Sequence, residues 1–234
     1  GITKIKVTDT STKRTTSIWV KVVNDSNIQI SLGYKFSVAL KQDGTVWSWG
    51  QNNDGELGLG NTTEYDEPQQ ITEITEKITD VKTGYYHSIA LTEKGEVYTW
   101  GYNGYGAMGY GKEENKSTER CISNEINEIN LKGYSGYILK EDGTIWSSGL
   151  NNYGQLGLGD TTNRTTFTQI KDKEGNAYKA KTIKAGVRSL QFIGEDGKVY
   201  VTGYNGYGQV GDKTTTNAVY PKAMVNADGT EVTD

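Results

Sequence analysis

The sequence predicts an all-β fold, a β-propeller built from repeated blades. First, four segments of similar sequence follow one another at intervals of about 50 residues. Second, each segment contains short runs that alternate between apolar and polar residues around turn residues, which indicates several short strands per repeat. Third, the chain has 30 glycines in 234 residues. A glycine inside a helix costs about 1 kcal/mol, so this composition argues against a helical bundle.

The repeats are most similar over residues 37–60, 88–111, 136–159 and 190–213. Their turn glycines lie 51, 48 and 54 residues apart, at Gly44, Gly95, Gly143 and Gly197. A second glycine follows each of these six residues later, at Gly50, Gly101, Gly149 and Gly203. An asparagine comes two residues after that, at Asn52, Asn103, Asn151 and Asn205. A period of this length with about four short strands is typical of a propeller blade.

Each repeat predicts its strands in the same order. A first strand should contain one aliphatic residue, namely Ile30, Val81, Ile129 or Ile183. Two further strands should flank a hairpin turn such as Asp43-Gly44, which we expect to be type I′ with positive φ at both central residues. The glycine-rich turn that follows should bury Leu57, Met108, Leu156 or Val210. A last short apolar stretch should begin at Ile71, Ile122, Ile170 or Met224.

One glycine position departs from the pattern in the third repeat. The other repeats open their first hairpin with Gly33, Gly84 and Gly186, whereas the third repeat has Lys132 there unless a one-residue gap moves Gly133 into register. Both prolines, Pro68 and Pro221, lie ten residues after the last motif glycine of their repeats. This shared offset supports the alignment of the repeats outside their most similar parts.

The repeats also divide the chain into regions. We expect four propeller repeats at about 28–78, 79–126, 127–180 and 181–234. Residues 1–27 are not a repeat. Their alternating pattern indicates a pair of β-strands, which is either the end of a preceding immunoglobulin-like domain or a pair used in ring closure.

The position of the last repeat suggests a longer parent protein. The chain ends where a fifth repeat should begin, so we expect the parent to continue. Repeat modules bury their faces only against neighbours. Four repeats should therefore form a partial ring, or a ring completed by self-association through the open blade ends.

The repeats resemble those of the regulator of chromosome condensation family. The pattern that carries the resemblance is G-x-x-H-S-x-A-L-x-x-x-G-x-V-Y-x-W-G-x-N-x-x-G-x-x-G, which the second repeat follows from Gly84 to Gly109 and which includes His87. The resemblance covers about residues 28–226 and implies a propeller, typically of seven blades. It also implies binding of proteins through loops on one propeller face. Relatives of this family bind small GTPases, chromatin or β-lactamases.

The sequence lacks the residues that most catalytic or cofactor sites require. A nucleophile and base pair needs a histidine, and His87 is the only one; its place in the repeat favours a packing role. Cys121 is the only cysteine, no zinc or calcium motif is present, and the glycine-rich runs precede no helix. Catalysis by a pair of carboxylates remains an alternative, because the chain has 29 acidic residues. We therefore expect no enzyme activity, no cofactor and no metal.

Charge and hydropathy narrow the range of partners. The net charge is −4 and there is no dense run of Lys or Arg, so we expect no nucleic-acid partner. No stretch of 18 apolar residues occurs, so we expect no membrane insertion. The expected partner is a protein or a glycan whose identity the sequence does not give.

Candidate binding residues lie in the turn after the third strand of each repeat. Four residues after the second glycine the repeats have Asp54, Tyr105, Tyr153 and Tyr207, and Tyr102 and Tyr204 lie nearby. Equivalent turns of a propeller form a ring on one face, and tyrosine offers a large rigid contact area. The alternative is that these aromatic residues pack on the next blade.

The sequence thus favours a non-catalytic protein-interaction or adhesion scaffold that binds through loops on one propeller face. The abundance of Asn, Ile, Lys and Tyr and the immunoglobulin-like flank point to a longer bacterial surface or secreted protein, and hence to an extracellular or cell-surface location. One alternative is a guanine-nucleotide exchange factor for a small GTPase. Another is a carbohydrate-binding module, because Tyr and Trp stack on sugars.

Overall fold

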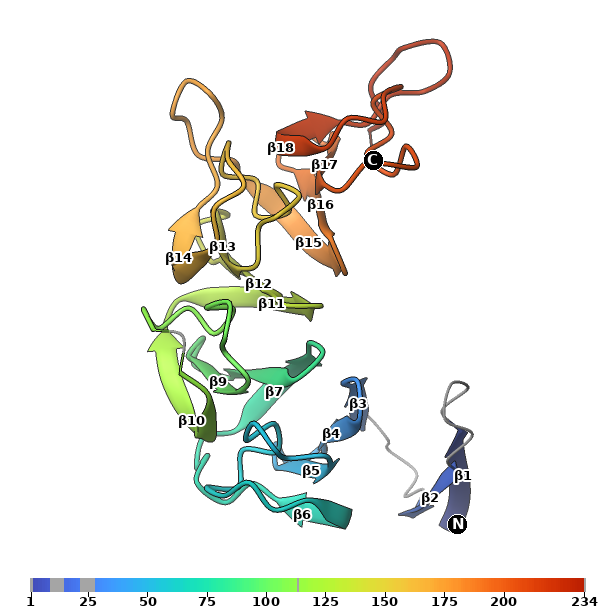
Figure 1. Ribbon diagram of the computed structural model, residues 1–234, viewed down its shortest axis with the longest axis vertical. Coiled ribbons are helices and arrows are strands. Elements are labelled where there is room, and N and C mark those ends of the chain that lie inside the picture. The colour runs from blue at the N-terminus through green and yellow to red at the C-terminus, as the bar shows by residue number, and fades with distance from the viewer. Residues whose placement is uncertain (1, 9–14, 22–27, 113, 234) are drawn as a thin grey trace.

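The computed structural model describes residues 2–8, 15–21, 28–112 and 114–233. Eighteen strands and no helix occur in these ranges (Figure 1). Sixteen of the strands form four antiparallel sheets of four, which are the predicted blades. The all-β propeller prediction, with four short strands per repeat, is therefore confirmed.

Each blade is a meander of four consecutive strands. Blade 1 contains β3 (Gln29–Leu32), β4 (Phe36–Leu40), β5 (Val46–Gly50) and β6 (Tyr65–Gln70). Blade 2 contains β7 (Ile78–Thr83), β8 (His87–Thr92), β9 (Val97–Gly101) and β10 (Lys116–Ser123). Blade 3 contains β11 (Ile126–Lys132), β12 (Ser135–Lys140), β13 (Ile145–Gly149) and β14 (Arg164–Gln169). Blade 4 contains β15 (Ala180–Gly186), β16 (Ser189–Gly194), β17 (Val199–Gly203) and β18 (Ala218–Ala223).

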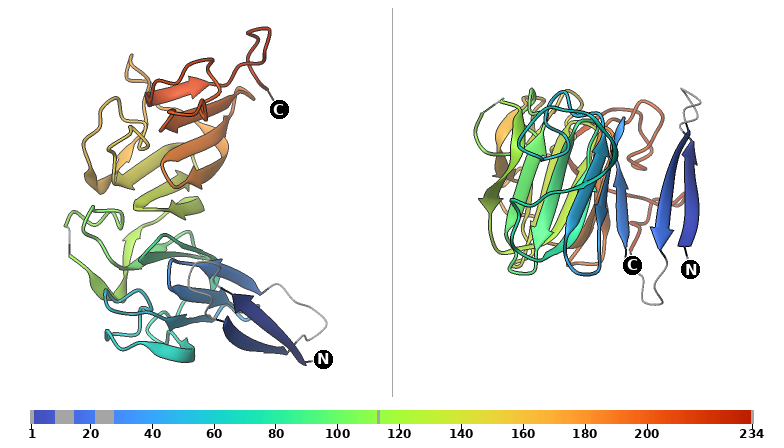
Figure 2. Two further views of the ribbon diagram at one scale, coloured as in Figure 1. Left: turned by 45° about the vertical axis from the view of Figure 1, so that its right-hand side comes forward. Right: turned by 90° about the horizontal axis from the view of Figure 1, so that it is seen from below.

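The four blades follow one another along an arc (Figures 1 and 2). The first strands β3, β7, β11 and β15 contact one another in that order. The fourth strands lie on the outside of the arc (Figure 1). Strands β1 (Ile2–Thr8) and β2 (Thr15–Lys21) form a separate antiparallel pair. The assignment of residues 1–27 to an immunoglobulin-like neighbour stays a prediction.

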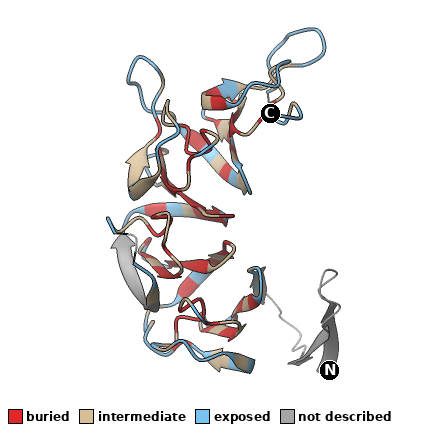
Figure 3. Cartoon of the chain, in the orientation of Figure 1, coloured by how far each residue is buried: buried red, intermediate tan, exposed pale blue. Residues whose placement is uncertain are grey.

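The hydrophobic core lies between the blades. Each of the three main apolar clusters joins residues of two adjacent blades, for example Val38 and Leu57 of blade 1 with Val81 and Trp100 of blade 2. The second strands show the consequence, because β8 is buried along its whole length, whereas β4 alternates between buried and half-buried residues. Figure 3 shows the buried positions along the sheets. An inner blade thus buries both faces, and an end blade buries one.

The fourth strands differ from the prediction. In blades 1, 3 and 4 they end directly before the expected apolar stretches, so that Ile71, Ile170 and Met224 follow β6, β14 and β18. In blade 2 the strand β10 contains Ile122 near its end. Residues of β6 are mostly exposed, because the strand is outermost and has little core to face. Pro68 and Pro221 both lie in these outermost strands, where a missing N–H breaks no internal ladder.

The hairpin turns also differ from the type I′ expectation. Gly44 has φ +85°, but Asp43 does not have a positive φ. The Gly44 N–H donates to the Lys41 carbonyl at 3.0 Å, and the Asp43 carboxylate accepts from the Thr45 N–H at 3.0 Å. The turn is therefore longer by one residue than a type I′ hairpin, and the aspartate is selected for its hydrogen bond rather than for its φ.

A fully buried asparagine organises the glycine-rich turn of every blade. Its side-chain oxygen accepts a backbone N–H five residues later, at Leu57, Met108, Leu156 or Val210, over 2.8–2.9 Å. Its side-chain nitrogen donates to carbonyls of the link to the fourth strand, for example Asp160 and Thr162 for Asn151. All four apolar anchors are fully buried, as predicted.

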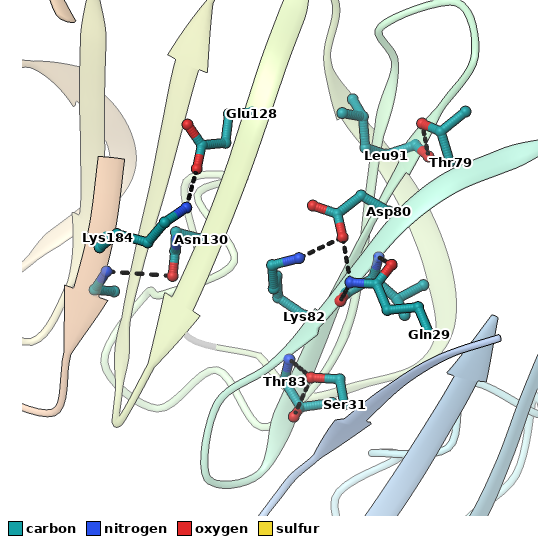
Figure 4. Close-up of polar contacts among 12 residues, drawn as sticks. Gln29, Ser31, Thr79, Asp80, Lys82, Thr83, Leu91, Glu128, Asn130 and Lys184 are labelled. Carbon is teal, nitrogen blue, oxygen red and sulfur yellow. Dashed lines mark hydrogen bonds and ion pairs between the residues drawn. The ribbon is translucent and has the colours of Figure 1, made fainter. Parts of the chain in front are cut away.

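Polar side chains join the first strands of neighbouring blades (Figure 4). Between blades 1 and 2, the Ser31 and Thr83 hydroxyls lie 2.9 Å apart, and Gln29 donates to the Asp80 carboxylate. Between blades 3 and 4, Glu128 accepts from Lys184 at 2.7 Å. These bonds fix the relative position of the blades on the inner side of the arc, where the apolar clusters end.

Candidate functional site

The predicted site residues all lie at one rim of the arc. In every blade this rim contains the turn between the first and second strands and the glycine-rich turn after the third strand. The opposite rim contains the turns between the second and third strands, at Gly44, Gly95, Gly143 and Gly197. Because the strands are antiparallel, equivalent turns of all blades gather on the same side.

Three positions recur at this rim. Position A is the residue before the second strand, position B follows the second glycine, and position C is the residue predicted to bind. Position A comprises Lys35, Tyr86, Tyr134 and Arg188; position B comprises Gln51, Tyr102, Leu150 and Tyr204; position C comprises Asp54, Tyr105, Tyr153 and Tyr207.

One hydrogen bond proves that positions A and B correspond between blades. The N–H at position B donates to the carbonyl at position A over 2.8–3.0 Å in all four blades. The glycine before position B has φ between +102° and +111°, and a Cβ there would lie 2.2–2.5 Å from that same carbonyl. Only glycine allows this close approach, which explains its recurrence at Gly50, Gly101, Gly149 and Gly203.

The same alignment resolves the irregular third repeat. The Tyr34 N–H donates to the Tyr85 carbonyl at 2.9 Å, and the Tyr85 N–H donates to the Gly133 carbonyl at 3.0 Å. Gly133 therefore occupies the place of Tyr34 and Tyr85, and Lys132 occupies the glycine position without a gap. These bonds join the first turns of blades 1, 2 and 3 into one platform.

Six tyrosine rings from three blades contact one another on this platform. Their centroids are 5.0–6.5 Å apart, mostly in edge-to-face arrangements, which aromatic pairs favour. We call this set the six-tyrosine cluster. It comprises Tyr34, Tyr85, Tyr86, Tyr102, Tyr105 and Tyr134.

The rim continues on blades 3 and 4 with a second aromatic group. The rings of Tyr153 and Tyr204 lie 5.1 Å apart, and Tyr207 contacts Tyr204. The Arg188 guanidinium lies 4.9 Å from the ring centre of Tyr153 and 5.7 Å from that of Tyr204. Together with the six-tyrosine cluster, this group forms what we call the tyrosine face. Nine of the 16 tyrosines of the chain belong to it.

The six residues predicted to bind a partner have three kinds of surroundings in the structure. Tyr102 and Tyr105 belong to the six-tyrosine cluster, and Tyr153 and Tyr204 form the pair under Arg188. Tyr207 is 87% exposed. Asp54 contacts the next blade through its Oδ1, which accepts a hydrogen bond from Asn115 at 2.7 Å. The alternative of packing on the next blade thus describes Tyr105 and Tyr153 in part, because both rings contact position A of the following blade.

Sequence reasoning missed half of the face. It did not identify Tyr34, Tyr85, Tyr86, Tyr134 or Arg188. The signal was present, since a tyrosine follows Gly33, Gly84 and Gly133 directly. This tyrosine pattern was not recognised because the third repeat has Lys132 in place of the glycine, so the turn residues of the repeats could not be aligned.

One side chain in each of three blades accepts a hydrogen bond from the N–H at position C, and it is buried in blades 1 and 3 and exposed in blade 4. The Glu56 carboxylate accepts from the Asp54 N–H at 2.8 Å, and Gln155 and Gln209 accept in the same way from Tyr153 and Tyr207 at 2.9 Å. Glu56 is fully buried, and this burial raises the pKa of its carboxyl above the usual value. Position C is therefore held at a fixed place on the rim.

The rim is acidic near blades 1 and 2. Burial raises the pKa of Asp54 and also that of Tyr86, and the neighbouring Tyr34, Glu56 and Asp54 raise the pKa of Tyr86 further. Burial and the surrounding tyrosines raise the pKa of Tyr134. The phenols of Tyr86 and Tyr134 are therefore neutral at pH 7 and present O–H groups and ring faces rather than charge.

His87 lies directly beneath the six-tyrosine cluster. It is 1% exposed, and neither ring nitrogen has a hydrogen-bond partner among the described residues. Burial lowers its pKa to about 4. A Cβ at Gly84 would lie 2.4 Å from its ring, so the histidine fills the space under the first turn of blade 2. Its geometry fits the packing role that the sequence favoured.

The recesses of this rim are shallow. One of about 240 Å³ is lined by Tyr34, Tyr85 and Lys132, and one of about 310 Å³ by Arg188, Tyr204 and Gln209. Within residues 28–112 and 114–233, no three His, Cys, Asp or Glu side chains gather as metal ligands would. In the same part of the chain, no helix could cross a membrane. The geometry favours contact with a broad surface over enclosure of a small molecule.

Comparisons with known proteins agree with this architecture. The chain is 32% identical over 187 residues to the ultraviolet-B receptor UVR8 of Arabidopsis thaliana, which covers 78% of this chain and 42% of UVR8. It is 38% identical over 91 residues to the mitochondrial RCC1 domain-containing protein RUG3 of the same plant, or 38% of this chain and 20% of RUG3. The chain therefore spans less than half of these relatives.

Solved structures show the same fold at low identity. Prp20p from Saccharomyces cerevisiae superposes with a TM-score of 0.75 at 19% identity, covering 91% of this chain and 53% of Prp20p. Human WBSCR16 superposes with a TM-score of 0.74 at 21% identity, covering 90% of this chain and 56% of that protein. The family model of the RCC1-like domain matches residues 4–234. This chain therefore belongs to the RCC1-like domain family, as the resemblance of its repeats implied.

Proposed function

We propose that this chain is a non-catalytic protein-binding module whose contact surface is the tyrosine face. The observation that carries the proposal is the gathering of nine tyrosines and one arginine from all four blades at one rim. Tyrosine and arginine are enriched among the residues that dominate binding energy at protein interfaces. Rings held by their neighbours also lose little entropy when a partner binds.

The backbone supports the same proposal. The glycine-dependent bonds between positions A and B fix the turns before any partner arrives. The hydrogen bonds from position C to the buried Glu56 and Gln155 and to the exposed Gln209 do the same. A preorganised surface avoids part of the ordering cost of association. The opposite rim contains charged turn residues such as Glu93 and Glu141. The aromatic group toward that rim, formed by Tyr178, Phe192 and Tyr200 at blade 4, joins three rings, whereas the tyrosine face joins nine rings of four blades.

A comparison of two rims tests the proposal. Tagged protein would be used to purify partners from extracts of the source cells, with quantitative mass spectrometry. The Tyr105→Ala/Tyr134→Ala variant should lose the captured proteins at least about tenfold, as truncation of central aromatic contacts does. The Glu93→Ala/Glu141→Ala variant of the opposite rim should capture them at the wild-type level. Equal capture by both variants contradicts the proposal.

The same variants separate the alternatives. Binding to a glycan array that depends on Tyr105 and Tyr134, without any captured protein, would favour the carbohydrate-binding module. Acceleration of nucleotide release from small GTPases would favour an exchange factor. The surface or secreted location likewise stays a proposal, and immunodetection on intact source cells tests it.

A further inference from the structure

The three junctions between blades form comparable groups at the tyrosine face. Each junction joins position C of one blade to the turn that carries positions A and B of the next, and we call each group an inter-blade triad. At the first junction the link is polar: Asp54 accepts from Asn115 of blade 2, and Asn115 accepts from the N–H of Asn103, the residue after Tyr102. The triads are Asp54, Tyr86 and Tyr102; Tyr105, Tyr134 and Leu150; and Tyr153, Arg188 and Tyr204.

The triad of blades 3 and 4 contains its own cation. The Arg188 guanidinium lies over the rings of both Tyr153 and Tyr204. Aromatic faces attract cations through their quadrupole, and arginine also stacks on them with its plane. This triad therefore shows that the rim can seat a guanidinium between the turns of two blades.

The triad of blades 1 and 2 has the opposite composition. Tyr86 stands where Arg188 does, and the carboxylate of Asp54 stands where the ring of Tyr153 does. The Tyr86 and Tyr102 rings lie 6.3 Å apart. Two acids thus lie at the junction that carries these two rings. The buried Glu56 carboxylate accepts from the Asp54 N–H, and both residues bond to blade 2, Asp54 with Asn115 and the Glu56 carbonyl with Trp100.

No described cation neutralises these acids. Asp54 accepts from Asn115, and Glu56 accepts from Gln51 and from the Asp54 backbone, but neither forms an ion pair within the described residues. Lys35 at position A of blade 1 contacts Tyr34, with its Nζ 5.6 Å from the ring centre. The middle triad has neither an acid nor a cation.

We infer that the triad of Asp54, Tyr86 and Tyr102 binds an arginine side chain of the partner protein. The guanidinium would stack on a tyrosine ring of this triad from the solvent side, in a contact of the kind that Arg188 makes with Tyr153 and Tyr204. Its N–H groups would donate to the Asp54 carboxylate. Arginine suits the site better than lysine because its planar fork both stacks and binds a carboxylate in two places. This inference rests on the proposed function, whose contact surface it specifies.

Peptide titration tests the inference with a defined probe. Protein labelled with ¹³C in its tyrosine rings would be titrated with acetyl-Gly-Arg-Gly-amide and followed by NMR, with ring signals assigned through single Tyr→Phe variants. The arginine peptide should shift the signals of Tyr86 and Tyr102. The citrulline peptide, which has the same shape without the charge, should bind at least about fivefold more weakly, in line with a cation–π contribution near 1 kcal/mol.

An isosteric variant tests whether the Asp54 carboxylate contributes to arginine binding. Asp54→Asn keeps an oxygen for the bond from Asn115, so the turn should keep its structure, and binding of the arginine peptide should weaken about threefold to tenfold. Asp66→Asn on the exposed strand β6 removes the same charge away from the rim and should leave binding unchanged. Equal shifts with arginine and citrulline peptides, or unchanged binding in Asp54→Asn, overturn the inference.

The inference and the proposed function fail in different ways. If the Tyr105→Ala/Tyr134→Ala variant still captures its partners, the tyrosine face is not the contact surface and the proposed function fails. If capture depends on the tyrosines but the peptide titration shows no preference for arginine, the face binds proteins through other side chains and only this inference is wrong.

Discussion

At the scale of single residues, the buried asparagines explain why the repeats share an Asn two positions after the second glycine. Asn151 is fully buried and joins three segments of its blade, through Leu156, Asp160 and Thr162. A shorter side chain would leave these backbone groups buried without partners, and each such group costs about 1–3 kcal/mol.

We therefore expect Asn151→Ala to lower the free energy of unfolding by about 3 kcal/mol, because at least one N–H and two carbonyls lose their partner. Urea denaturation followed by tyrosine and tryptophan fluorescence measures this. The neighbouring Asn152 is exposed, and Asn152→Ala should change stability by less than about 0.5 kcal/mol. A similar loss in both variants would show that the asparagine bonds do not stabilise the turn.

His87 predicts a pH dependence of stability. Its pKa in the folded chain is about 4 and its ordinary value is 6.5. As the pH falls below 6.5, the histidine is therefore protonated in the unfolded chain but stays neutral in the folded chain. The contribution of the neutral His87 to the free energy of unfolding is therefore fully present above pH 6.5 and is lost as the pH falls. At pH 5 the loss is about 2 kcal/mol.

Comparison with His87→Phe isolates this effect, because blade 1 has Phe36 at the equivalent place. The difference in unfolding free energy between the two proteins, measured in urea from pH 5 to pH 7.5, should change in favour of the variant as the pH falls. A constant difference across this range would mean that the histidine is hydrated or hydrogen-bonded in solution.

At the scale of the elements, the first three strands of each blade were predictable and the fourth was not. The first three carry apolar residues toward a neighbouring blade, so their alternation is visible in the sequence. The fourth strand is outermost: β6 is mostly exposed and β14 mostly half-buried, so no alternating apolar pattern marks these strands. The backbone, not the side chains, determines its position through pairing with the third strand.

The site was predictable to the same extent. Position C could be found because a glycine precedes it at a constant distance in every repeat. Position A lies in a turn whose side chains face solvent, so burial leaves no pattern there, and Lys132 conceals the register. The pairing of the blades, which joins Tyr105 to Tyr134, depends on contacts between repeats and is not encoded within one repeat.

The turn glycines allow a matched prediction at this scale. Gly101 has φ +105°, and a Cβ there would lie 2.5 Å from the Tyr86 carbonyl, whereas Gly175 has φ +92° and no atom within 4 Å of its Cβ position. Gly175→Ala should cost about 1–2 kcal/mol from backbone strain alone. Gly101→Ala should cost at least about 2 kcal/mol more, because the backbone must also move.

Urea denaturation of both glycine variants measures the difference. The control is wild-type protein in the same buffer, and the NMR signals of Tyr86 and Tyr102 report whether the rim has moved. Equal losses of stability in the two variants would show that φ strain, and not the close approach of positions A and B, selects the glycine.

At the scale of the whole molecule, stability arises between blades, and one position of the repeat shows this directly. Ile30 and Ile129 are equivalent residues of the first strands of blades 1 and 3, but Ile129 is fully buried and Ile30 is 44% exposed. Ile129 packs against Ile89 and Leu91 of blade 2. The apolar residues Ile28, Ile30 and Leu32 of blade 1 face outward.

Ile129→Ala should therefore lower the unfolding free energy by about 3–4 kcal/mol, and Ile30→Ala by less than about 1 kcal/mol. Denaturation at two protein concentrations measures both values. A loss near 3 kcal/mol for Ile30→Ala would mean that this side of blade 1 is covered in solution. Self-association through the open blade ends, which stays a prediction, would then be the explanation if the loss also depended on concentration.

Site-specific photo-crosslinking shows directly whether the tyrosine face contacts a partner protein. Benzoylphenylalanine would replace Tyr105 in one protein and Glu141 of the opposite rim in another, and both would be irradiated in the source cells. The account predicts a distinct crosslinked protein from position 105 and none above background from position 141. Crosslinking from position 141 alone, or equally from both, would contradict it.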